Sequence, residues 1–169
     1  MRIALLSDHL QVAPTLARWH ADEWSSLMPD WSYEPALTEL LTHTRRDTIP
    51  LTLLALDGPE VLGSASLIAE DLPGWEHLTP WLASVFVAPS TRGRGVGTRL
   101  VSEAARTAQR LGVSRLHLFT AGQADFYHRL GWTEFAKAEL RGHPVVILAL
   151  GLAEPNTGTV ASFPTNGAS

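Results

Sequence analysis

Residues 85–100 read VFVAPSTRGRGVGTRL. A short apolar run stops at Pro89, a turn rich in glycine and arginine follows, and apolar side chains then recur with the spacing of an amphipathic helix, expected at 95–111. A further apolar run at 114–120 predicts another strand. Because strand, helix and strand follow one another over 82–120, we expect two parallel strands joined by a right-handed crossover.

Apolar runs on both sides extend this unit into a larger sheet. Strands are expected at 3–7, 51–56, 61–68, 82–88, 114–120, 132–140 and 144–150, and helices at 10–24, 34–46, 95–111 and 122–130. A turn at Asp57-Gly58-Pro59 makes the second and third strands an antiparallel hairpin, and the last two strands are also expected to be antiparallel. The predicted fold class is α/β, in the α+β sense: a mixed sheet of about seven strands with helices on both faces.

The composition excludes several classes of protein. The chain has 169 residues, 45% of them apolar, which is enough for one domain with its own core. It has no cysteine, and therefore no disulfide, no thiolate zinc site and no cysteine nucleophile. The seven histidines lack zinc-binding spacing, so we expect no metal. We assign 1–152 to a single domain and 153–169, rich in small and polar residues, to a flexible polar tail.

The charge is small in total but uneven. A net charge of −4 argues against nucleic acid as a partner. No apolar stretch is long enough for a membrane span and the N-terminus lacks the pattern of a signal peptide, so we expect a cytoplasmic protein. Residues 92–115 carry six arginines and one acidic residue, a net of +5, whereas residues 1–91 carry a net of −8. The basic block begins at the glycine-rich turn.

That turn has the features of a phosphate-binding site. Gly93, Gly95 and Gly97 allow the backbone to approach a ligand closely, and the free N–H groups at the helix start favour an anion. Arg92 and Arg94 can add charge-assisted hydrogen bonds. The spacing fits neither a Walker loop nor a dinucleotide-binding turn. The alternative is a basic helix start whose glycines only ease the turn, but the order of strand, proline, turn and helix favours phosphate.

The same residues resemble the GNAT (GCN5-related) N-acetyltransferase family. The family motif Arg/Gln-x-x-Gly-x-Gly/Ala is met by residues 92–97, and the similarity covers roughly residues 1–150. The resemblance implies the GNAT acyl-CoA N-acyltransferase fold, with the pyrophosphate of acetyl-CoA at the turn and its pantetheine arm at the backbone of the preceding strand. The coenzyme-binding residues that it implies are Phe86, Val87, Arg92, Gly93, Arg94, Gly95, Val96, Gly97, Thr98 and, further along, Gln123.

A second stretch, LFTAGQADFYHRLGW at 118–132, resembles the strand end, short helix and tyrosine of the same family. The resemblance implies that Tyr127 protonates the departing thiolate, which suits a phenol with an unperturbed pKa near 10. The alternative is an aromatic ring that packs its helix on the sheet. Gln123 either forms a capping box with Thr120 or contacts the coenzyme.

Two details are similar to one branch of the family. The form Leu-x-Thr-x-x-Gln-x-x-Phe-Tyr and the pair Glu23-Trp24 resemble a branch that includes the animal actin N-terminal acetyltransferase. This likeness favours a coenzyme contact for Gln123. It does not make actin the expected substrate, because the segments expected to meet the acceptor show no comparable match.

Acetyl transfer to an amine also needs a proton acceptor, because an alkyl amine is mostly protonated at neutral pH. The segment 70–81 offers Glu70, Asp71, Glu76 and His77. We rank Glu70 and Glu76 first as candidate bases. Each of the four can equally be a solvated loop residue.

The six tryptophans divide into two groups. Trp24, Trp31, Trp75 and Trp81 are candidates to line an acceptor cleft, with Trp24 and Trp81 taken as the substrate-contacting pair, and Trp19 and Trp132 are assigned to the core. The acidic surplus of residues 1–91 would attract a cationic amine, although scattered surface acids explain it equally well.

The predicted function is therefore an N-acetyltransferase that moves the acetyl group of acetyl-CoA to a primary amine, of a small molecule or a peptide, by direct attack in a ternary complex. The expected partners are acetyl-CoA and an amine acceptor, with no nucleic acid and no membrane. An alternative is a non-catalytic acyl-CoA-binding sensor or partner domain on the same fold. A third hypothesis is an anion-binding protein unrelated to coenzyme A. Monomer and homodimer both stay open.

Overall fold

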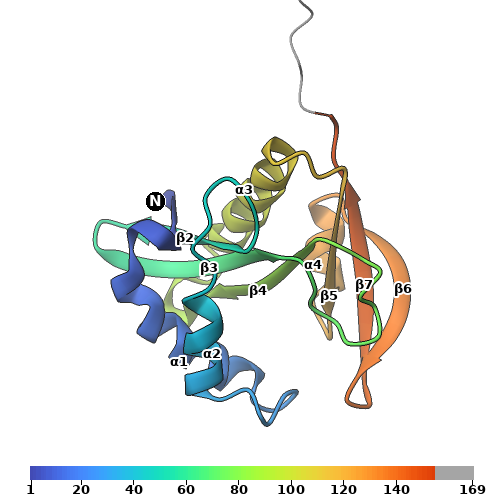
Figure 1. Ribbon diagram of the computed structural model, residues 1–169, viewed down its shortest axis with the longest axis horizontal. Coiled ribbons are helices and arrows are strands. Elements are labelled where there is room, and N and C mark those ends of the chain that lie inside the picture. The colour runs from blue at the N-terminus through green and yellow to red at the C-terminus, as the bar shows by residue number, and fades with distance from the viewer. Residues whose placement is uncertain (155–169) are drawn as a thin grey trace, which may run out of the picture.

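One mixed sheet of seven strands organises residues 1–154, which are the residues described by this computed structural model (Figure 1). The order in the sheet is β1-β2-β3-β4-β5-β7-β6. The strands are β1 Arg2–Leu5, β2 Leu51–Asp57, β3 Glu60–Ile68, β4 Trp81–Val87, β5 Arg115–Thr120, β6 Thr133–Leu140 and β7 His143–Gly151. The helices are α1 Ala13–Trp24, α2 Tyr33–Leu40, α3 Val96–Arg110 and α4 Ala124–Arg129, with short 3₁₀ turns at Leu6–Asp8, Leu10–Val12 and Pro89–Thr91. The predicted sheet and its flanking helices are confirmed.

The centre of the sheet is its one parallel junction among the described residues, between β4 and β5, as predicted for the strand-helix-strand unit. The two strands are paired there through Trp81 and His117. Beyond that pair the two strands diverge, and β4 also carries a bulge opposite β3, where Ser84 has a φ of 52°. Bulges turn a strand locally and are common beside functional sites. The divergence and the bulge together open the sheet toward the carboxyl ends of both strands.

Helices cover the two faces of the sheet separately. On one face, α1 and α2 pack on β2 through a cluster that includes Leu16, Leu40 and Leu54. On the other face, the amphipathic α3 packs through Leu100 and its apolar neighbours, in a larger cluster that includes Tyr127 of α4. Because α3 connects β4 to β5, this packing holds the glycine-rich turn at the open end of the sheet.

Two predicted helices differ from the structure by more than two residues at one end. The helix expected at 34–46 ends at Leu40, because His43 turns into the core and Thr44 forms an isolated β-bridge with Leu51. The helix expected at 10–24 becomes a 3₁₀ turn followed by α1, with Pro14 in the first helical turn. Both differences come from tertiary contacts that helical periodicity does not encode.

The predicted tail at 153–169 lies outside the described residues apart from its first two. Within that part, the Ala153 carbonyl accepts a hydrogen bond from Gln109 Nε2 at 2.8 Å. The helices of residues 1–154 are all too short or too polar to cross a bilayer.

Candidate active site

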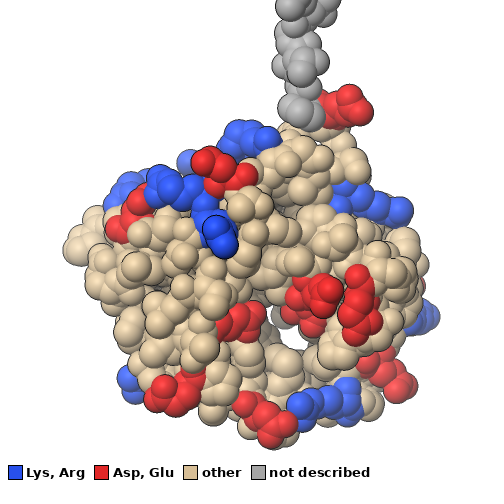
Figure 2. Space-filling view, viewed as in Figure 1, with Lys and Arg blue, Asp and Glu red and all other residues tan. Residues whose placement is uncertain are grey.

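The divergence of β4 and β5 creates a cleft of about 470 Å³. Its walls come from the end of α1 and the segment after it, from α2, from the loop that follows β3, from the bulge of β4, and from the end of β5 with the start of α4. Figure 2 shows an opening in the surface between α2 and the end of β5, with acidic side chains beside it. Parts of the chain that lie far apart in the sequence therefore meet around one hollow.

The start of α3 lies at the end of β4 and presents unpaired backbone N–H groups. Gly93 and Gly95 have φ values of 77° and 79°, in the region that favours glycine. Gly95 is the N-cap residue, no side chain caps the helix, and its first turn contains no acidic residue. The first N–H groups of a helix have no intrahelical acceptor, so those of Val96, Gly97 and Thr98 are free to bind an anion. The predicted turn thus fits the phosphates of coenzyme A.

Arg92 fixes the corner between β4 and α3. Its Nε donates a hydrogen bond to the Val87 carbonyl at 3.1 Å, and its guanidinium lies 5.7 Å from the centre of the Phe86 ring. Its Nη2 also lies 3.9 Å from Oε2 of Glu23, a residue that lines the cleft. About half of the side chain stays exposed, as does that of Arg94, so both remain accessible to a phosphate.

In the strand before the turn, the backbone rather than the side chains is available to a ligand. The Phe86 ring is buried and stacks on Trp19 at a centroid distance of 5.3 Å, so only its backbone can meet a ligand. On the β3 side, Phe86 and Val87 are paired with Ser64 and Gly63. On the β5 side the strands have diverged, and residues 82–85 of β4 line the cleft, whereas Phe86 and Val87 lie just beyond its lining.

Tyr127 packs in the core and also reaches the cleft. The side chain is buried, with its ring in edge-to-face contact with Phe126 and Trp132 at 5.0 and 6.1 Å, and it also lines the cleft. Burial raises the pKa of Tyr127 to about 12. The phenol is therefore protonated at neutral pH and has a proton to donate.

Gln123 also lies at the cleft. Thr120 Oγ1 accepts hydrogen bonds from the backbone N–H groups of Gln123, at 3.0 Å, and Gly122, at 3.4 Å. This is one half of the predicted capping box. Because α4 begins at Ala124, Gln123 takes the N-cap position instead of the third helical position. Its exposed side chain lines the cleft.

The predicted bases differ in whether they line the cleft. Glu70 and Asp71 line the cleft, whereas Glu76 does not. The prediction for Glu76 is wrong, because its exposed carboxylate turns back to accept a hydrogen bond from Gly74 N–H at 2.9 Å, which lowers its pKa. His77 is exposed and stacks on Trp75 outside the cleft.

Asp71 is the most strongly perturbed carboxyl group of the cleft. Burial, and after it the negative charge of Glu39, raise the pKa of Asp71 to about 7. Glu39 lines the same cleft, and burial raises its pKa too. Sequence reasoning missed Glu39, since a glutamate inside an amphipathic helix is normally a solvated residue and nothing in its spacing marks it.

Trp24 and Trp31 line the cleft, and Trp24 was one of the two predicted substrate-contacting residues. The prediction for Trp81 is wrong. Trp81 is 0% exposed, packs beside His117 and Phe119, and donates its indole N–H to the Leu78 carbonyl at 2.7 Å. A fully buried ring that anchors the loop before β4 cannot meet an acceptor.

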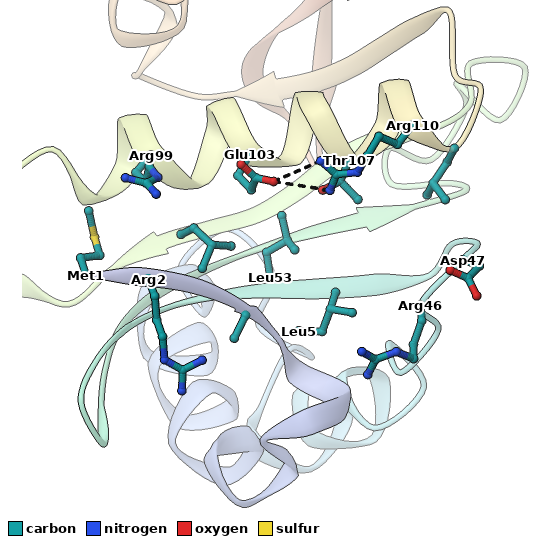
Figure 3. A pocket seen from close by; sticks show the side chains of 13 residues that line it. Met1, Arg2, Leu5, Arg46, Asp47, Leu53, Arg99, Glu103, Thr107 and Arg110 are labelled. Atoms are coloured by element: carbon teal, nitrogen blue, oxygen red, sulfur yellow. Dashed lines mark hydrogen bonds and ion pairs between the residues drawn. The ribbon is translucent and has the colours of Figure 1, made fainter. Parts of the chain in front are cut away.

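A second hollow, of about 830 Å³, lies between β1 and α3 (Figure 3). Arg99, Glu103 and Arg110 of α3 face the edge of β1 across it. Glu103 is bonded to Arg110 at 3.4 Å, and Arg46, on the opposite wall at the same end as Arg110, pairs with Asp8. None of the predicted catalytic or coenzyme-binding residues lines this hollow. The cleft, by contrast, is lined by the predicted residues Tyr127, Glu70, Gln123 and Trp24, and the predicted coenzyme-binding residues at 86–98 line neither hollow.

A comparison with protein families decides the assignment. The model of the Acetyltransferase (GNAT) family matches residues 14–132. The chain belongs to this family. The match spans both the glycine-rich turn and Tyr127, and acetyl-CoA is the coenzyme of GNAT acetyltransferases. No group of three metal-ligating side chains occurs within residues 1–154.

Solved structures share the GNAT fold. An aminoglycoside 6'-N-acetyltransferase complexed with coenzyme A is 19% identical, with a TM-score of 0.66 over 92% of this chain and 99% of that one. A ribosomal-protein-alanine N-acetyltransferase from Brucella melitensis is 21% identical, with a TM-score of 0.69 over 90% of this chain and 100% of that one. A GNAT acetyltransferase from Streptococcus pneumoniae is 18% identical, with a TM-score of 0.63 over 90% of this chain and 100% of that one.

At these identities the likeness shows the fold and leaves the acceptor open. No curated protein matches the sequence. The comparisons support the family but not the narrower resemblance to the branch with the animal actin N-terminal acetyltransferase.

Proposed function

We propose that the protein is an acetyl-CoA-dependent N-acetyltransferase that acetylates a primary amine by direct attack in a ternary complex. The observation that carries this proposal is the cleft itself, where the hydroxyl-bearing Tyr127 and the carboxyl-bearing Asp71 line one hollow beside the bulge of β4. A proton donor and a proton acceptor in one cleft are what transfer from a thioester to an amine requires.

The coenzyme contributes an acetyl thioester, and the chain positions it. The N–H groups at the start of α3, with Arg92 and Arg94, hold the phosphates. The free edge of β4 near Phe86 and Val87 binds the pantetheine arm and directs N–H groups at the thioester carbonyl. Gln123 contacts the coenzyme from the other side of the cleft.

Two residues move the protons. Asp71 accepts the proton that the amine nitrogen loses as this nitrogen bonds to the acetyl carbon. Tyr127 donates a proton to the sulfur as the carbon–sulfur bond breaks. We prefer Asp71 to Glu70 as the base, because a pKa of about 7 suits proton transfer at neutral pH and Glu70 is exposed.

The acceptor is a cationic amine. Four carboxyl groups line the cleft, those of Glu23, Glu39, Glu70 and Asp71, and no lysine, arginine or histidine from the described part of the chain does. Such a cleft attracts ammonium groups and repels carboxylates. Trp24 adds an aromatic ring to this wall, a surface that favours cations further. The acetyl-CoA-dependent reaction is proposed to take place in the cytoplasm, by a monomer or a homodimer.

Release of coenzyme A thiol is the direct test. The protein is incubated with acetyl-CoA and a panel of diamines, aminoglycosides, lysine peptides, peptide N-termini and neutral or acidic amines. We expect thiol release with cationic acceptors and none with acidic ones. Binding of acetyl-CoA without thiol release from any amine would favour the non-catalytic sensor.

A matched pair of arginine variants separates coenzyme binding from general anion binding. Arg92→Ala removes the contacts at the turn, whereas Arg106→Ala removes an exposed arginine of α3 that pairs with Glu103. We expect Arg92→Ala to weaken coenzyme A binding about tenfold and Arg106→Ala to leave it unchanged. Equal affinity in the two variants would point to an anion site unrelated to coenzyme A.

A further inference from the structure

Glu39 reaches the cleft from α2 and is held there by a buried histidine. Its Oε1 lies 3.6 Å from Nε2 of His43, four residues along the chain. The Glu39 side chain is 35% exposed, whereas that of His43 is 5% exposed. One side of the carboxyl group therefore contacts the protein interior and the other faces the cleft that it shares with Asp71.

His43 is anchored in turn to the centre of the sheet. Its Nδ1 lies 3.1 Å from Oγ1 of Thr52 on β2, and that hydroxyl lies 2.7 Å from Oγ of Ser66 on β3. All three side chains are buried. Two hydroxyl groups in series can orient to suit either tautomer of the ring, so the chain of contacts fixes the position of the imidazole.

The protonation of His43 follows from its surroundings. Burial lowers the pKa of His43 to about 4, so the ring is neutral at neutral pH and has one N–H group. A hydroxyl can donate to Nδ1, whereas a carboxylate can only accept. The favoured tautomer therefore has its N–H on Nε2, beside Glu39, and at 3.6 Å the contact is an electrostatic one that is too long for a hydrogen bond. The contact orients the Glu39 carboxylate without neutralising its charge.

We propose that Glu39, anchored by His43, is a positioning residue that makes Asp71 the proton acceptor for the attacking amine. This inference rests on the proposed acetyl transfer. It adds to that reaction a residue that does not itself touch the reacting atoms, together with the anchor that holds it.

The physical reasons are the burial of Asp71 and, after it, the cost of placing a second negative charge in the same cleft. The negative charge of Glu39 raises the pKa of Asp71, Glu70 adds further negative charge, and Tyr127, which also lines the cleft, is neutral. Within residues 1–154 no cationic side chain lines the cleft, Arg92 lies 3.9 Å from the Glu23 carboxylate, and the histidines behind the cleft, His43 and His20, are neutral. The pair of carboxyl groups therefore keeps one proton up to about pH 7, and Asp71 holds it.

This arrangement gives Asp71 the basicity that the reaction needs. An ordinary aspartate is too weak a base to take a proton from an ammonium group efficiently, and a carboxyl group with a pKa near the working pH is matched to that task. In the balanced step, Asp71 takes the first proton from the ammonium group and passes it to solvent. The neutral amine then forms its bond to the acetyl carbon while Asp71 gains the second proton from the nitrogen, and Tyr127 gives a proton to the sulfur as the carbon–sulfur bond breaks. Solvent then returns both residues to their starting states.

The first measurement needs no turnover. The carboxyl carbon of Asp71 is titrated by NMR in the full chain without coenzyme, in the wild type, in Glu39→Gln and in the control Glu34→Gln, which removes an exposed carboxyl group from the first turn of the same helix. We expect the pKa of Asp71 to fall below about 7 in Glu39→Gln, while burial keeps it above the ordinary value of an aspartate, and to stay in place in Glu34→Gln. An unchanged Asp71 titration in Glu39→Gln would overturn the inference whether or not the protein is an enzyme.

The second measurement is the pH profile of kcat/KM with an accepted amine. Loss of the Glu39 charge should move the acidic limb to lower pH by the same amount as the NMR titration and reduce the plateau about tenfold. Thr52→Val, which breaks the anchor while leaving Glu39 in place, should move the limb in the same direction by a smaller amount. Asp71→Asn should abolish the limb, and Glu70→Gln should retain it.

The two measurements distinguish a failure of this inference from a failure of the proposed function. A shifted titration with an unmoved limb, or a limb that disappears in Glu70→Gln but persists in Asp71→Asn, would overturn the assignment of Asp71 as proton acceptor. Absence of turnover with every amine would remove the catalytic role together with the proposed function. The NMR titration would then still decide whether Glu39 controls Asp71. Circular dichroism of each variant identifies any that fails to fold.

Discussion

Nε2 of His20 lies 3.1 Å from Oγ of Ser64, so that a histidine of α1 is joined to strand β3 by a contact that is buried away from water. His20 is 1% exposed, and the rings of Trp24 and Phe86 lie beside it. Burial lowers the pKa of His20 to about 4, as it does for His43. Two neutral imidazoles therefore lie beneath α1 and α2, on the side of the sheet that forms the wall of the cleft.

These histidines make the stability of the fold sensitive to acid. In the unfolded chain both rings bind protons near pH 6.5, but in the folded chain only near pH 4, so the unfolded state holds more protons between these values. Asp71 acts in the opposite direction, because the folded state keeps its proton up to about pH 7 and the unfolded state loses it near pH 3.8. Between about pH 6.5 and pH 4 the two histidines give the unfolded state two extra protons, and Asp71 gives the folded state one, so the unfolded state holds a net surplus of one proton. The free energy of unfolding should therefore fall by about 1.4 kcal/mol per pH unit as pH drops through this range.

Urea unfolding at pH 7, 6 and 5 measures this slope. Asp71→Asn removes the opposing group and should steepen the fall to about 2.7 kcal/mol per pH unit, while His20→Gln should flatten it. A slope that is the same in all three proteins would contradict the assignment of these groups. Constant stability from pH 7 to pH 4 in the wild type would do so as well.

Two glycines of α3 allow a matched test of the coenzyme turn. Gly95 before the helix and Gly112 after it have φ values of 79° and 84°, and a Cβ added at either position would meet nothing within 4 Å. Alanine at either position should therefore lower the free energy of unfolding by a similar amount, about 1–2 kcal/mol, from backbone strain alone. Only Gly95→Ala should also weaken coenzyme A binding, about tenfold, because it displaces the N–H groups of the turn.

Calorimetric titration with coenzyme A and thermal unfolding of both variants separate the two effects. If Gly112→Ala lost as much affinity as Gly95→Ala, the loss would come from general destabilisation. The assignment of the turn as the phosphate site would then lack support.

The hydroxyl of Tyr127 can be removed with little change in packing. Phenylalanine keeps the ring contacts with Phe126 and Trp132, so Tyr127→Phe should fold normally. The thiolate then has no protein proton donor, and kcat should fall about tenfold to a hundredfold with unchanged coenzyme affinity. Steady-state kinetics and calorimetry measure the two quantities. Tyr33→Phe, at the other tyrosine of the chain, is the control, and equal turnover in the two variants would remove Tyr127 from catalysis.

The sequence predicted the parts of the site that are local. The strand, turn and helix around Gly95 follow one another within about thirty residues, so periodicity and glycine positions are sufficient to find them. Tyr127 was predicted from a shorter motif, at 118–132. The acidic wall was predicted less well, because Glu39 and Asp71 meet only when α2 and the loop after β3 pack on the same end of the sheet.

The two wrong site residues have a common physical origin. Glu76 and Trp81 lie on either side of a loop whose path is decided by its own contacts: the carboxylate of Glu76 bonds back to Gly74, and the indole of Trp81 bonds to Leu78. A sequence pattern shows that such residues lie near the site in the chain. It does not show whether their side chains face a cleft or the core.

Gly63 shows how closely the strand beneath the coenzyme turn is packed. It pairs with Val87, and a Cβ at this position would collide with the Phe86 carbonyl and approach Leu100 Cδ1 to 3.1 Å. Gly63→Ala must therefore push β4 away from β3 at the bulge, and we expect a loss of about 2–3 kcal/mol in the free energy of unfolding together with weaker coenzyme binding. Gly151→Ala is the control, since it adds a methyl group to a strand where nothing lies within 4 Å, and its effect should stay within about 0.5 kcal/mol. Urea unfolding tests the packing argument, which would be contradicted if both variants lost the same stability. Coenzyme binding tests the link to the turn, since wild-type affinity in folded Gly63→Ala would show that the position of β4 does not control the turn.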